Sequence, residues 1–247
     1  MKQIILIPLL LLSVTGQAST KYVFNVSRNE VVLDNGSDIV RSIASVTKLM
    51  TAIVILDSKV DLSEKVPYKG RWLSKNVTRE DLLQIMLVKS DNHAAEYLAM
   101  SYPGGRSTFI TMMNIKADQL KMYSTSFVDP SGIGSDNKST ARDLTTLLQH
   151  AYSYDNIRHI TSTSSYNIKL NNKQKKKERY VTVNNTNRNL LNEFEEIQIS
   201  KTGTTNAAGK CLVMFLDRNG QHYAVIILGE RNKQSVENIS RSIIRSL

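Results

Sequence analysis

The sequence has a single cysteine among 247 residues, so it forms neither an internal disulfide nor a zinc site built from several cysteines. Neither glycine-rich phosphate-binding pattern, G-x-G-x-x-G or G-x-x-x-x-G-K-S/T, occurs, and we therefore expect no nucleotide. His93 and Glu96 lie three residues apart, a spacing that metal ligands use on helices, but no second pair accompanies them. We therefore expect no metal and no other cofactor.

Acidic residues are in the minority, since 22 Asp and Glu stand against 32 Lys and Arg and give a net charge of +10. This surplus favours an anionic environment such as cell-wall polymer, a phospholipid surface or nucleic acid. Aromatic residues are not interleaved with basic ones, so we expect no nucleic-acid partner. The basic run at Lys173–Lys177 is interpreted as a solvated loop.

Long hydrophobic runs are also scarce. Lys2, the apolar residues 4–12 and the small residues of Gly16-Gln17-Ala18 follow one another as in a signal peptide. We therefore predict that residues 1–18 are a signal peptide and that residues 19–247 form one exported domain. The alternative is an uncleaved membrane anchor. No later apolar stretch reaches the about 20 residues that span a bilayer, so we expect no stable membrane span after cleavage.

Strand patterns lie near both ends of the chain, and helix patterns lie between them. Strands are expected at residues 22–26, 30–33, 197–200, 211–216 and 223–228, the last two joined by a turn at Asp217–Gly220. Helices are expected at residues 45–56, 79–88, 93–100, 109–120, 141–152 and 235–247. Residues 161–189 are expected to form loops and a short hairpin. This order predicts an α/β fold in which one sheet carries a helical insert.

Ser45-Val46-Thr47-Lys48 is an S-x-x-K sequence at the start of the most apolar expected helix. Residues three apart lie about one turn apart, so the Ser45 hydroxyl and the Lys48 amine share a helix face. A serine nucleophile needs a base in that position. The backbone N–H of Ser45 belongs to the first helical turn, where it is free to receive an oxyanion.

Two further short sequences support this chemistry. Ser90-Asp91-Asn92 joins two expected helices and can project side chains into a cleft, whereas a second S-D-N at Ser135–Asn137 follows a Pro- and Gly-rich turn. No apolar helix begins at Ser135, so nothing would bury Lys138 of the competing S-x-x-K, and we favour Ser45 and Ser90. Lys201-Thr202-Gly203 follows the expected strand 197–200, and a lysine beside hydroxyl groups suits a carboxylate.

S-x-x-K, S-D-N and K-T-G in this order are typical of class A β-lactamases and penicillin-binding proteins. From about residue 20 to its end, the chain resembles the low-molecular-mass D-alanyl-D-alanine peptidases, and most of all the endopeptidase group of penicillin-binding protein 7. The stretches that carry the resemblance are 41–52, 129–132, 139–144, 185–187 and 201–214. The resemblance implies a β-lactamase/D,D-peptidase-like fold, with a mostly antiparallel sheet sandwiched between helices. It also implies peptidoglycan stem peptides as substrate, β-lactams as acylating inhibitors and a periplasmic location.

The resemblance further implies acyl transfer, with Ser45 as nucleophile, Lys48 as its base and Ser90 as the proton relay to the leaving amine. The backbone N–H groups of Ser45 and Thr204 would form the oxyanion hole. We expect burial and the positive charge of Lys201 to lower the pKa of Lys48. The substrate-binding residues implied are Asn92, Lys201, Thr202, Gly203 and Thr204.

The primary hypothesis is a D,D-endopeptidase that hydrolyses D-Ala–diaminopimelate cross-links, because the chain ends after one helix without the extra β domain of many related carboxypeptidases. A D-Ala-D-Ala carboxypeptidase remains the main alternative, because both substrates place a carboxylate beside the scissile bond. A β-lactamase is less favoured, since the loop Asp129–Asn137 lacks the Glu that class A enzymes use as a base. The remaining alternative is a non-catalytic wall-binding protein, which would not react with penicillin.

Overall fold

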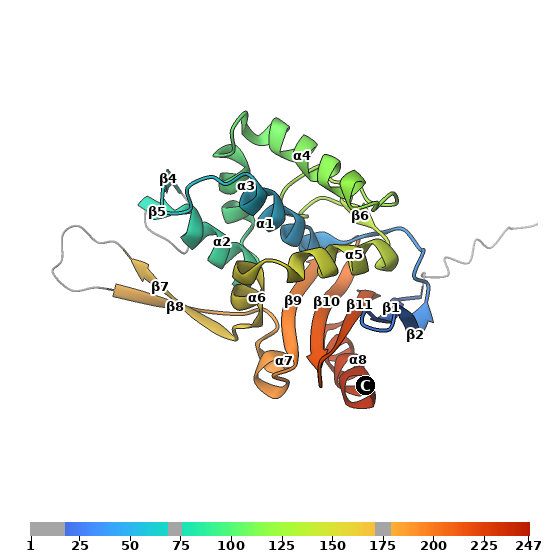
Figure 1. Cartoon of the computed structure of the whole chain (residues 1–247). Coiled ribbons are helices and arrows are strands. Elements are labelled where there is room, and N and C mark those ends of the chain that lie inside the picture. Colours follow the sequence, from blue (N-terminus) through green and yellow to red (C-terminus); the bar gives the residue numbers. More distant parts are fainter. Residues whose placement is uncertain (1–17, 69–75, 171–178) are drawn as a thin grey trace, which may run out of the picture.

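The computed structural model describes residues 18–68, 76–170 and 179–247 (Figure 1). Nearly all of the predicted signal peptide and the basic run Lys173–Lys177 lie outside these residues. Within them, strands lie near both ends of the chain and helices lie between, as the sequence predicts.

A five-stranded sheet carries the fold, with the strand order β2-β1-β11-β10-β9 and only antiparallel neighbours. Its strands are β1 (Thr20–Asn25), β2 (Glu30–Asn35), β9 (Ile197–Thr205), β10 (Gly209–Arg218) and β11 (Gln221–Glu230). The pairing of β1 with β11 joins the two ends of the chain in one sheet. β10 and β11 are connected by Asn219 and Gly220, whose φ angles of 55° and 75° are those that a two-residue hairpin turn needs. The predicted hairpin is thereby confirmed.

The helices lie on both sides of this sheet. They are α1 (Lys48–Asp57), α2 (Arg79–Val88), α3 (Asn92–Met100), α4 (Gly105–Gln119), α5 (Ala141–Tyr152), α6 (Asp155–Ser162), α7 (Arg188–Glu193) and α8 (Lys233–Ser246). Three small sheets pair β3 (Arg41–Ser42) with β6 (Lys138–Ser139), β4 (Lys65–Pro67) with β5 (Asn76–Thr78), and β7 (Ser165–Leu170) with β8 (Arg179–Asn184). The side chains of Thr78 and Thr140 cap α2 and α5, which confirms both T-x-x-D signals.

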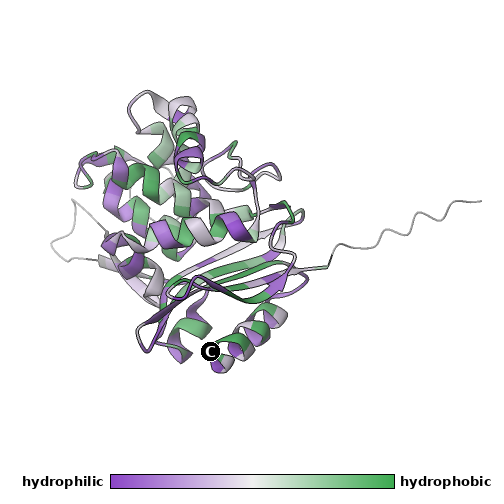
Figure 2. Ribbon diagram, turned by 45° about the vertical axis from the view of Figure 1, so that its right-hand side comes forward, coloured by the Kyte–Doolittle hydropathy of each residue, from purple (hydrophilic) through white to green (hydrophobic). Residues whose placement is uncertain are grey.

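Each face of the sheet has its own hydrophobic core. α5 packs on one face with α1–α4 beyond it, and α8 packs on the other (Figure 1). Alternate residues of a strand point to opposite faces, and those of β10 divide between the two cores. Cys211, Val213 and Phe215 belong to the larger core, whereas Leu212, Met214 and Leu216 belong to the α8 side. The central strands are hydrophobic along most of their length, as Figure 2 shows.

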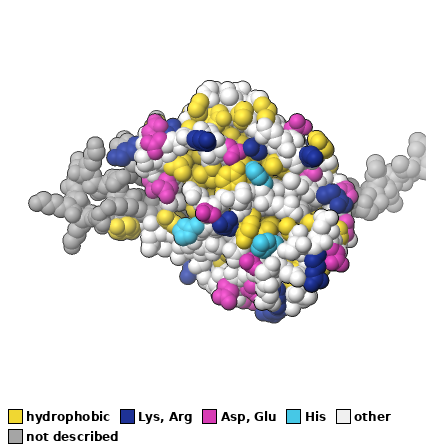
Figure 3. Space-filling model, in the orientation of Figure 1, with side chains coloured by type: hydrophobic (Ala, Val, Ile, Leu, Met, Phe, Trp, Pro, Cys, Tyr) yellow, Lys and Arg dark blue, Asp and Glu magenta, His cyan; other side chains and the backbone are white. Residues whose placement is uncertain are grey.

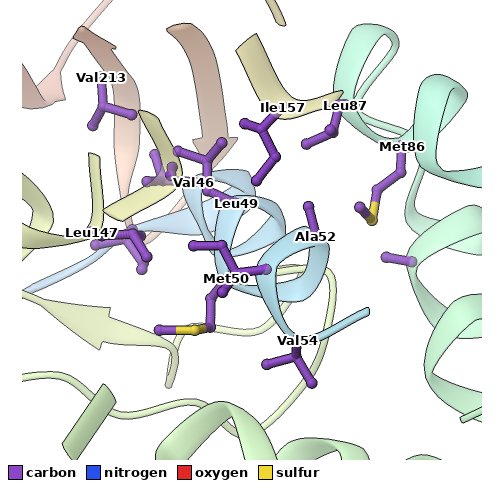
Figure 4. Close-up of a cluster of buried hydrophobic side chains, with 14 of the residues drawn as sticks. Val46, Leu49, Met50, Ala52, Val54, Met86, Leu87, Leu147, Ile157 and Val213 are labelled. Atoms are coloured by element: carbon purple, nitrogen blue, oxygen red, sulfur yellow. The ribbon is translucent and has the colours of Figure 1, made fainter. Parts of the chain in front are cut away.

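α1 lies in the middle of the larger core, and all but its last two residues are buried. Figure 4 shows Leu49 and Met50 of α1 surrounded by apolar side chains that come from α2, α5, α6 and β10. A helix that is apolar on nearly every side must be enclosed in this way. The predicted buried helix is confirmed, and it supplies a rigid base for the residues at its N-terminus.

Three local predictions differ from the structure. The helices α6 and α7 were not expected, and buried residues such as Ile157 and Leu190 hold these short helices in place. α4 begins at Gly105 rather than at residue 109, directly after Gly104 with a φ of 85°. β9 continues past residue 200, so K-T-G lies inside the strand and not after it.

On the face shown in Figure 3, positive and negative side chains are interspersed rather than gathered into one patch. Among the described residues, no helix combines the length and the apolar composition needed to cross a bilayer.

Candidate active site

Ser45 and Lys48 meet at the N-terminal end of α1. Ser45 lies in a short 3-10 helix, Ala44–Thr47, and not in the first turn of an α-helix as predicted, because α1 begins at Lys48. A 3-10 turn also places residues three apart above one another. Lys48 Nζ and Ser45 Oγ are accordingly 2.9 Å apart, and Ser45 is partly exposed.

The Lys48 side chain is 0% exposed, and burial lowers its pKa to about 7 against the opposing effect of Asp129 and Asp91. The lowering of the pKa of Lys48 therefore comes chiefly from burial, as predicted, and the predicted repulsion between Lys48 and Lys201 is also present. The pKa of Lys201 is itself lowered well below its usual value, first by burial and then by the charge of Lys48. Near neutral pH a substantial fraction of Lys48 is therefore an uncharged amine.

Two acceptors orient this amine. Lys48 Nζ donates to Asn92 Oδ1 at 2.7 Å and to the carbonyl oxygen of Ser131. An uncharged amine has two N–H bonds and one lone pair, and these two oxygens can only accept. Both N–H bonds are thus used, and the lone pair is left for the Ser45 hydroxyl, which is the arrangement of a base ready to take a proton.

The Ser131 carbonyl is held in place by the loop that begins at Asp129. The Asp129 carboxylate accepts the backbone N–H groups of Ser131 at 2.7 Å, Gly132 at 2.5 Å and Gly134 at 3.4 Å. Burial alone would raise the pKa of Asp129, but these N–H groups outweigh it and keep the pKa below its usual value. The loop therefore contains a permanent anion that fixes its shape.

Asn137, which is fully buried, also holds the Asp129 loop in place. Its Oδ1 accepts the backbone N–H of Val128 at 2.8 Å, and its Nδ2 donates to Thr47 Oγ1 at 3.0 Å. The Asn of the second S-D-N sequence, Asn137, therefore has a structural role. Ser135 and Lys138, on either side of it, are exposed. No buried lysine stands beside Ser135, so the structure agrees with the preference for Ser45.

Ser90, Asp91 and Asn92 form the connection between α2 and α3. Ser90 has a φ of 60°, a strained value for serine that tends to occur at functional sites. The Asp91 carboxylate turns inward, where it caps α3 by accepting the N–H of Ala94 at 2.7 Å. Ser90 and Asn92, on either side of this anchor, reach the two buried lysines: Ser90 Oγ lies 2.9 Å from Lys201 Nζ.

β9 brings the K-T-G residues against the nucleophile. Lys201 and Gly203 lie opposite Val213 and Cys211 in the β10 ladder, so they face the larger core and Ser45, while Thr202 and Thr204 face the α8 side. A Cβ on Gly203 would lie 2.9 Å from the Ile43 carbonyl oxygen and 3.2 Å from the Ser45 nitrogen. The missing side chain therefore lets the strand approach the Ser45 backbone closely and places Thr204 beside it.

Five residues were not among the predicted site residues, although they shape the site. Thr186 Oγ1 accepts the Thr202 hydroxyl at 2.6 Å, and Asn187 Nδ2 donates to Ser200 Oγ at 2.7 Å, so this loop braces β9. The stretches 129–132 and 185–187, which take part in the family resemblance, were the available signal for four of them, and Asn137 lies in neither stretch. The missed residues are Asp129, Ser131, Asn137, Thr186 and Asn187.

His93 and Glu96, weighed as metal ligands, lie on α3 beside the site, and Glu96 accepts Arg106 at 2.7 Å. Within the described ranges, no group of three or more His, Cys, Asp or Glu residues is placed to hold a metal ion.

The chain is similar in sequence to D-alanyl-D-alanine peptidases. The family model described as D-alanyl-D-alanine carboxypeptidase matches residues 13–232. The chain is 38% identical over 218 residues to the D-alanyl-D-alanine endopeptidase of Escherichia coli, which covers 83% of this chain and 69% of that protein. It is 36% identical over 211 residues to the protein of the same name from Pseudomonas aeruginosa, covering 81% and 67%.

Solved structures agree with the fold. The Streptomyces K15 DD-transpeptidase superposes with a TM-score of 0.83 at 28% identity, over 91% of this chain and 94% of that one. Penicillin-Binding Protein D2 from Listeria monocytogenes in its ampicillin-bound form gives a TM-score of 0.80 at 25% identity, over 92% and 95%. The predicted fold class is confirmed.

Proposed function

Since the chain belongs to the D-alanyl-D-alanine carboxypeptidase family of serine peptidases, we propose that it is a D,D-endopeptidase that hydrolyses D-alanyl–diaminopimelate cross-links of peptidoglycan. The Escherichia coli and Pseudomonas aeruginosa relatives both carry the name endopeptidase. The observation that carries the catalytic proposal is the buried Lys48 amine, 2.9 Å from Ser45 Oγ with its two N–H bonds already engaged.

Acylation begins when Ser45 Oγ attacks the carbonyl carbon of D-alanine and its proton passes to Lys48 Nζ. The carbonyl oxygen becomes an oxyanion, which the backbone N–H groups of Ser45 and Thr204 would bind. A single such donor contributes roughly 10²–10³ in rate. Because Asn92 Oδ1 is occupied by Lys48, its Nδ2 is the group that would donate to the substrate amide carbonyl.

The second half of the reaction releases the amine. The carbon–nitrogen bond breaks, and the leaving nitrogen takes the hydroxyl proton of Ser90, which is replaced by the proton that Lys48 took from Ser45. Lys201, 2.9 Å from Ser90 Oγ, would bind the carboxylate beside the scissile bond together with the Thr204 hydroxyl, or with the Thr202 hydroxyl once it turns away from Thr186 Oγ1. The approach of that anion raises the pKa of Lys201 and so favours the charged form of the amine, which burial disfavours. Water then hydrolyses the D-alanyl ester of Ser45. A β-lactam acylates the same hydroxyl, and the ester of its opened ring is hydrolysed slowly.

A D-Ala-D-Ala carboxypeptidase is the second candidate, because a relative from Bacillus subtilis that is 26% identical carries that name. A β-lactamase is less favoured. The loop beside the site supplies Asp129 rather than Glu, and backbone N–H groups already occupy its carboxylate.

The proposal predicts the fate of mixed muropeptides. Purified protein given cross-linked dimers and pentapeptide monomers is expected to convert dimers to monomers, as measured by liquid chromatography with mass detection. Ser45→Ala and penicillin-treated protein are expected to convert none, because both lack the free hydroxyl. Release of terminal D-alanine with all dimers intact would contradict the proposal and identify a carboxypeptidase.

We also propose that the chain is exported to the periplasm with residues 1–18 removed, which the order of Lys2, the apolar residues 4–12 and Gly16–Ala18 supports. Full-length chain produced in a Gram-negative host is then expected in the periplasmic extract, with an N-terminal sequence that begins at Ser19. Uncleaved chain in the membrane fraction would instead support the anchor alternative.

A further inference from the structure

A cavity of about 210 Å³ lies on the α8 side of β9, directly beside the K-T-G residues. Its wall includes Thr202, Gly203 and Thr204 of β9, Thr186 and Asn187 of the preceding loop, and residues of α8. The remaining lining residues are Lys210, Cys211, Lys233, Val236 and Glu237. We call this cavity the β9–α8 pocket. None of its α8 residues takes part in the mechanism of acylation or amine release.

A second cavity, of about 460 Å³, lies on the other side of the site along the Ser90–Asn92 connection. It is lined by Asn92 and Ser131, the two residues whose oxygens accept Lys48. Its lining also includes Ser90, the proposed proton relay to the leaving amine, so this cavity adjoins the scissile bond itself. The β9–α8 pocket instead adjoins Thr202 and Thr204, whose hydroxyls are the proposed partners of the carboxylate of the leaving group, and we therefore assign it to the side of the leaving group.

The walls of the β9–α8 pocket suit an uncharged aliphatic chain. Val236, the threonine methyl groups and the lysine stems provide apolar surface. The two charged α8 residues of its wall are paired with each other: Glu237 Oε1 lies 3.5 Å from Lys233 Nζ and accepts Asn189 Nδ2 at 3.0 Å. Glu237 Oε2 also lies 3.4 Å from Arg241.

The two possible leaving groups differ beyond the carbon that bears their carboxylate. A leaving D-alanine ends there in a methyl group. A leaving diaminopimelate residue continues through three methylenes to a second peptide. A methyl group would leave the pocket largely empty, whereas a methylene chain would contact Val236 and the lysine stems.

We infer that the β9–α8 pocket receives the methylene chain of the leaving diaminopimelate residue and thereby favours cross-links over terminal D-alanine. The inference rests on the proposed endopeptidase function and names the residues that select its leaving group. Binding energy gained away from the reacting bond raises the rate for the longer substrate only.

The test fills the pocket without touching Ser45, Lys48, Ser90 or β9. Lys233 is the first residue of α8, and its side chain is 62% exposed, so Lys233→Trp covers the mouth of the pocket without disturbing the core. Val236→Phe fills the pocket from inside. Both are expected to lower kcat/KM for dimer cleavage by roughly tenfold or more, the size of effect that poor fit of an aliphatic group produces. Release of D-alanine from pentapeptide and acylation by penicillin are expected to stay within about twofold, and they also report correct folding.

A matched control tests whether a large ring anywhere on α8 has the same effect. Asn238→Trp places that ring on the exposed side of α8, outside the pocket, and is expected to cleave dimers like the unchanged protein. Unchanged dimer cleavage in Lys233→Trp and Val236→Phe would overturn the inference. An equal loss of dimer cleavage in Asn238→Trp, or an equal loss of penicillin acylation in the two pocket variants, would also overturn it. Absence of dimer cleavage in the unchanged protein would be a failure of the proposed function itself.

Discussion

Lys48→Met is expected to reduce the rate at which penicillin acylates Ser45 by about 10³-fold or more. Methionine is similar in length and suits a buried position, but its thioether cannot take the proton of Ser45 Oγ. The Lys48 amine also holds Asn92 Oδ1 and the Ser131 carbonyl, so its loss disorders the groups that position the substrate. The rate is measured with a fluorescent penicillin by rapid quench, and the melting temperature shows that the variant is folded.

Lys138→Met is the matched control, because Lys138 occupies the same place in the competing S-x-x-K sequence but is exposed. It is expected to acylate at the normal rate. In the unchanged protein the acylation rate should also rise with pH through about 7, because Lys48 must lose its proton to act as a base and its pKa lies at about 7. A rate that does not change between about pH 5 and 9, or a Lys48→Met variant of nearly normal rate, would show that another group takes the proton.

Gly132→Ala is expected to destabilise the protein by about 4 kcal/mol or more and to abolish acylation with it. Gly132 has a φ of 74°, and a Cβ there would lie 1.9 Å from the carbonyl oxygen of Ala44 and 2.7 Å from Thr47 Oγ1. The clash is with the backbone next to Ser45 and cannot be relieved by a side-chain rotation. Either the Asp129 loop or the nucleophile must move, and the Ser131 carbonyl that orients Lys48 moves with the loop.

Gly220→Ala separates the clash from the cost of the backbone angle. Gly220 has a φ of 75°, but a Cβ there would meet no atom within 4 Å. Its replacement is expected to cost only the about 1–2 kcal/mol of a left-handed alanine. Urea unfolding of both variants, with comparison of midpoints and slopes, gives the difference in the free energy of unfolding. An equal decrease in the free energy of unfolding in the two variants would mean that the close contact between Gly132 and Ala44 does not make Gly132→Ala more destabilising. Failure of Gly132→Ala alone to yield folded protein would agree with the prediction.

Features that depend on neighbouring residues were readable in the sequence. Asn219-Gly220 specified its own hairpin turn, and Thr78 and Thr140 capped the helices that they precede. S-x-x-K brought Ser45 and Lys48 together even though the turn is 3-10 rather than α, because either helix places residues three apart on one side. The strands at both ends and the buried α1 follow from the same short-range patterns.

The protonation and orientation of the Lys48 amine were decided by residues far apart in the chain. The pKa of Lys48 depends on how completely other segments bury it, and the direction of its lone pair depends on Asn92 and on Ser131, which is 83 positions away. The position of K-T-G inside β9, the brace from Thr186 and the pocket under α8 exist only once β9, β10, the Thr186 loop and α8 pack together. By itself the sequence determined which chemical groups are present and their local conformation. Only tertiary packing decided their desolvation, their partners and the space between them, because burial and enclosed volume are properties of many segments at once.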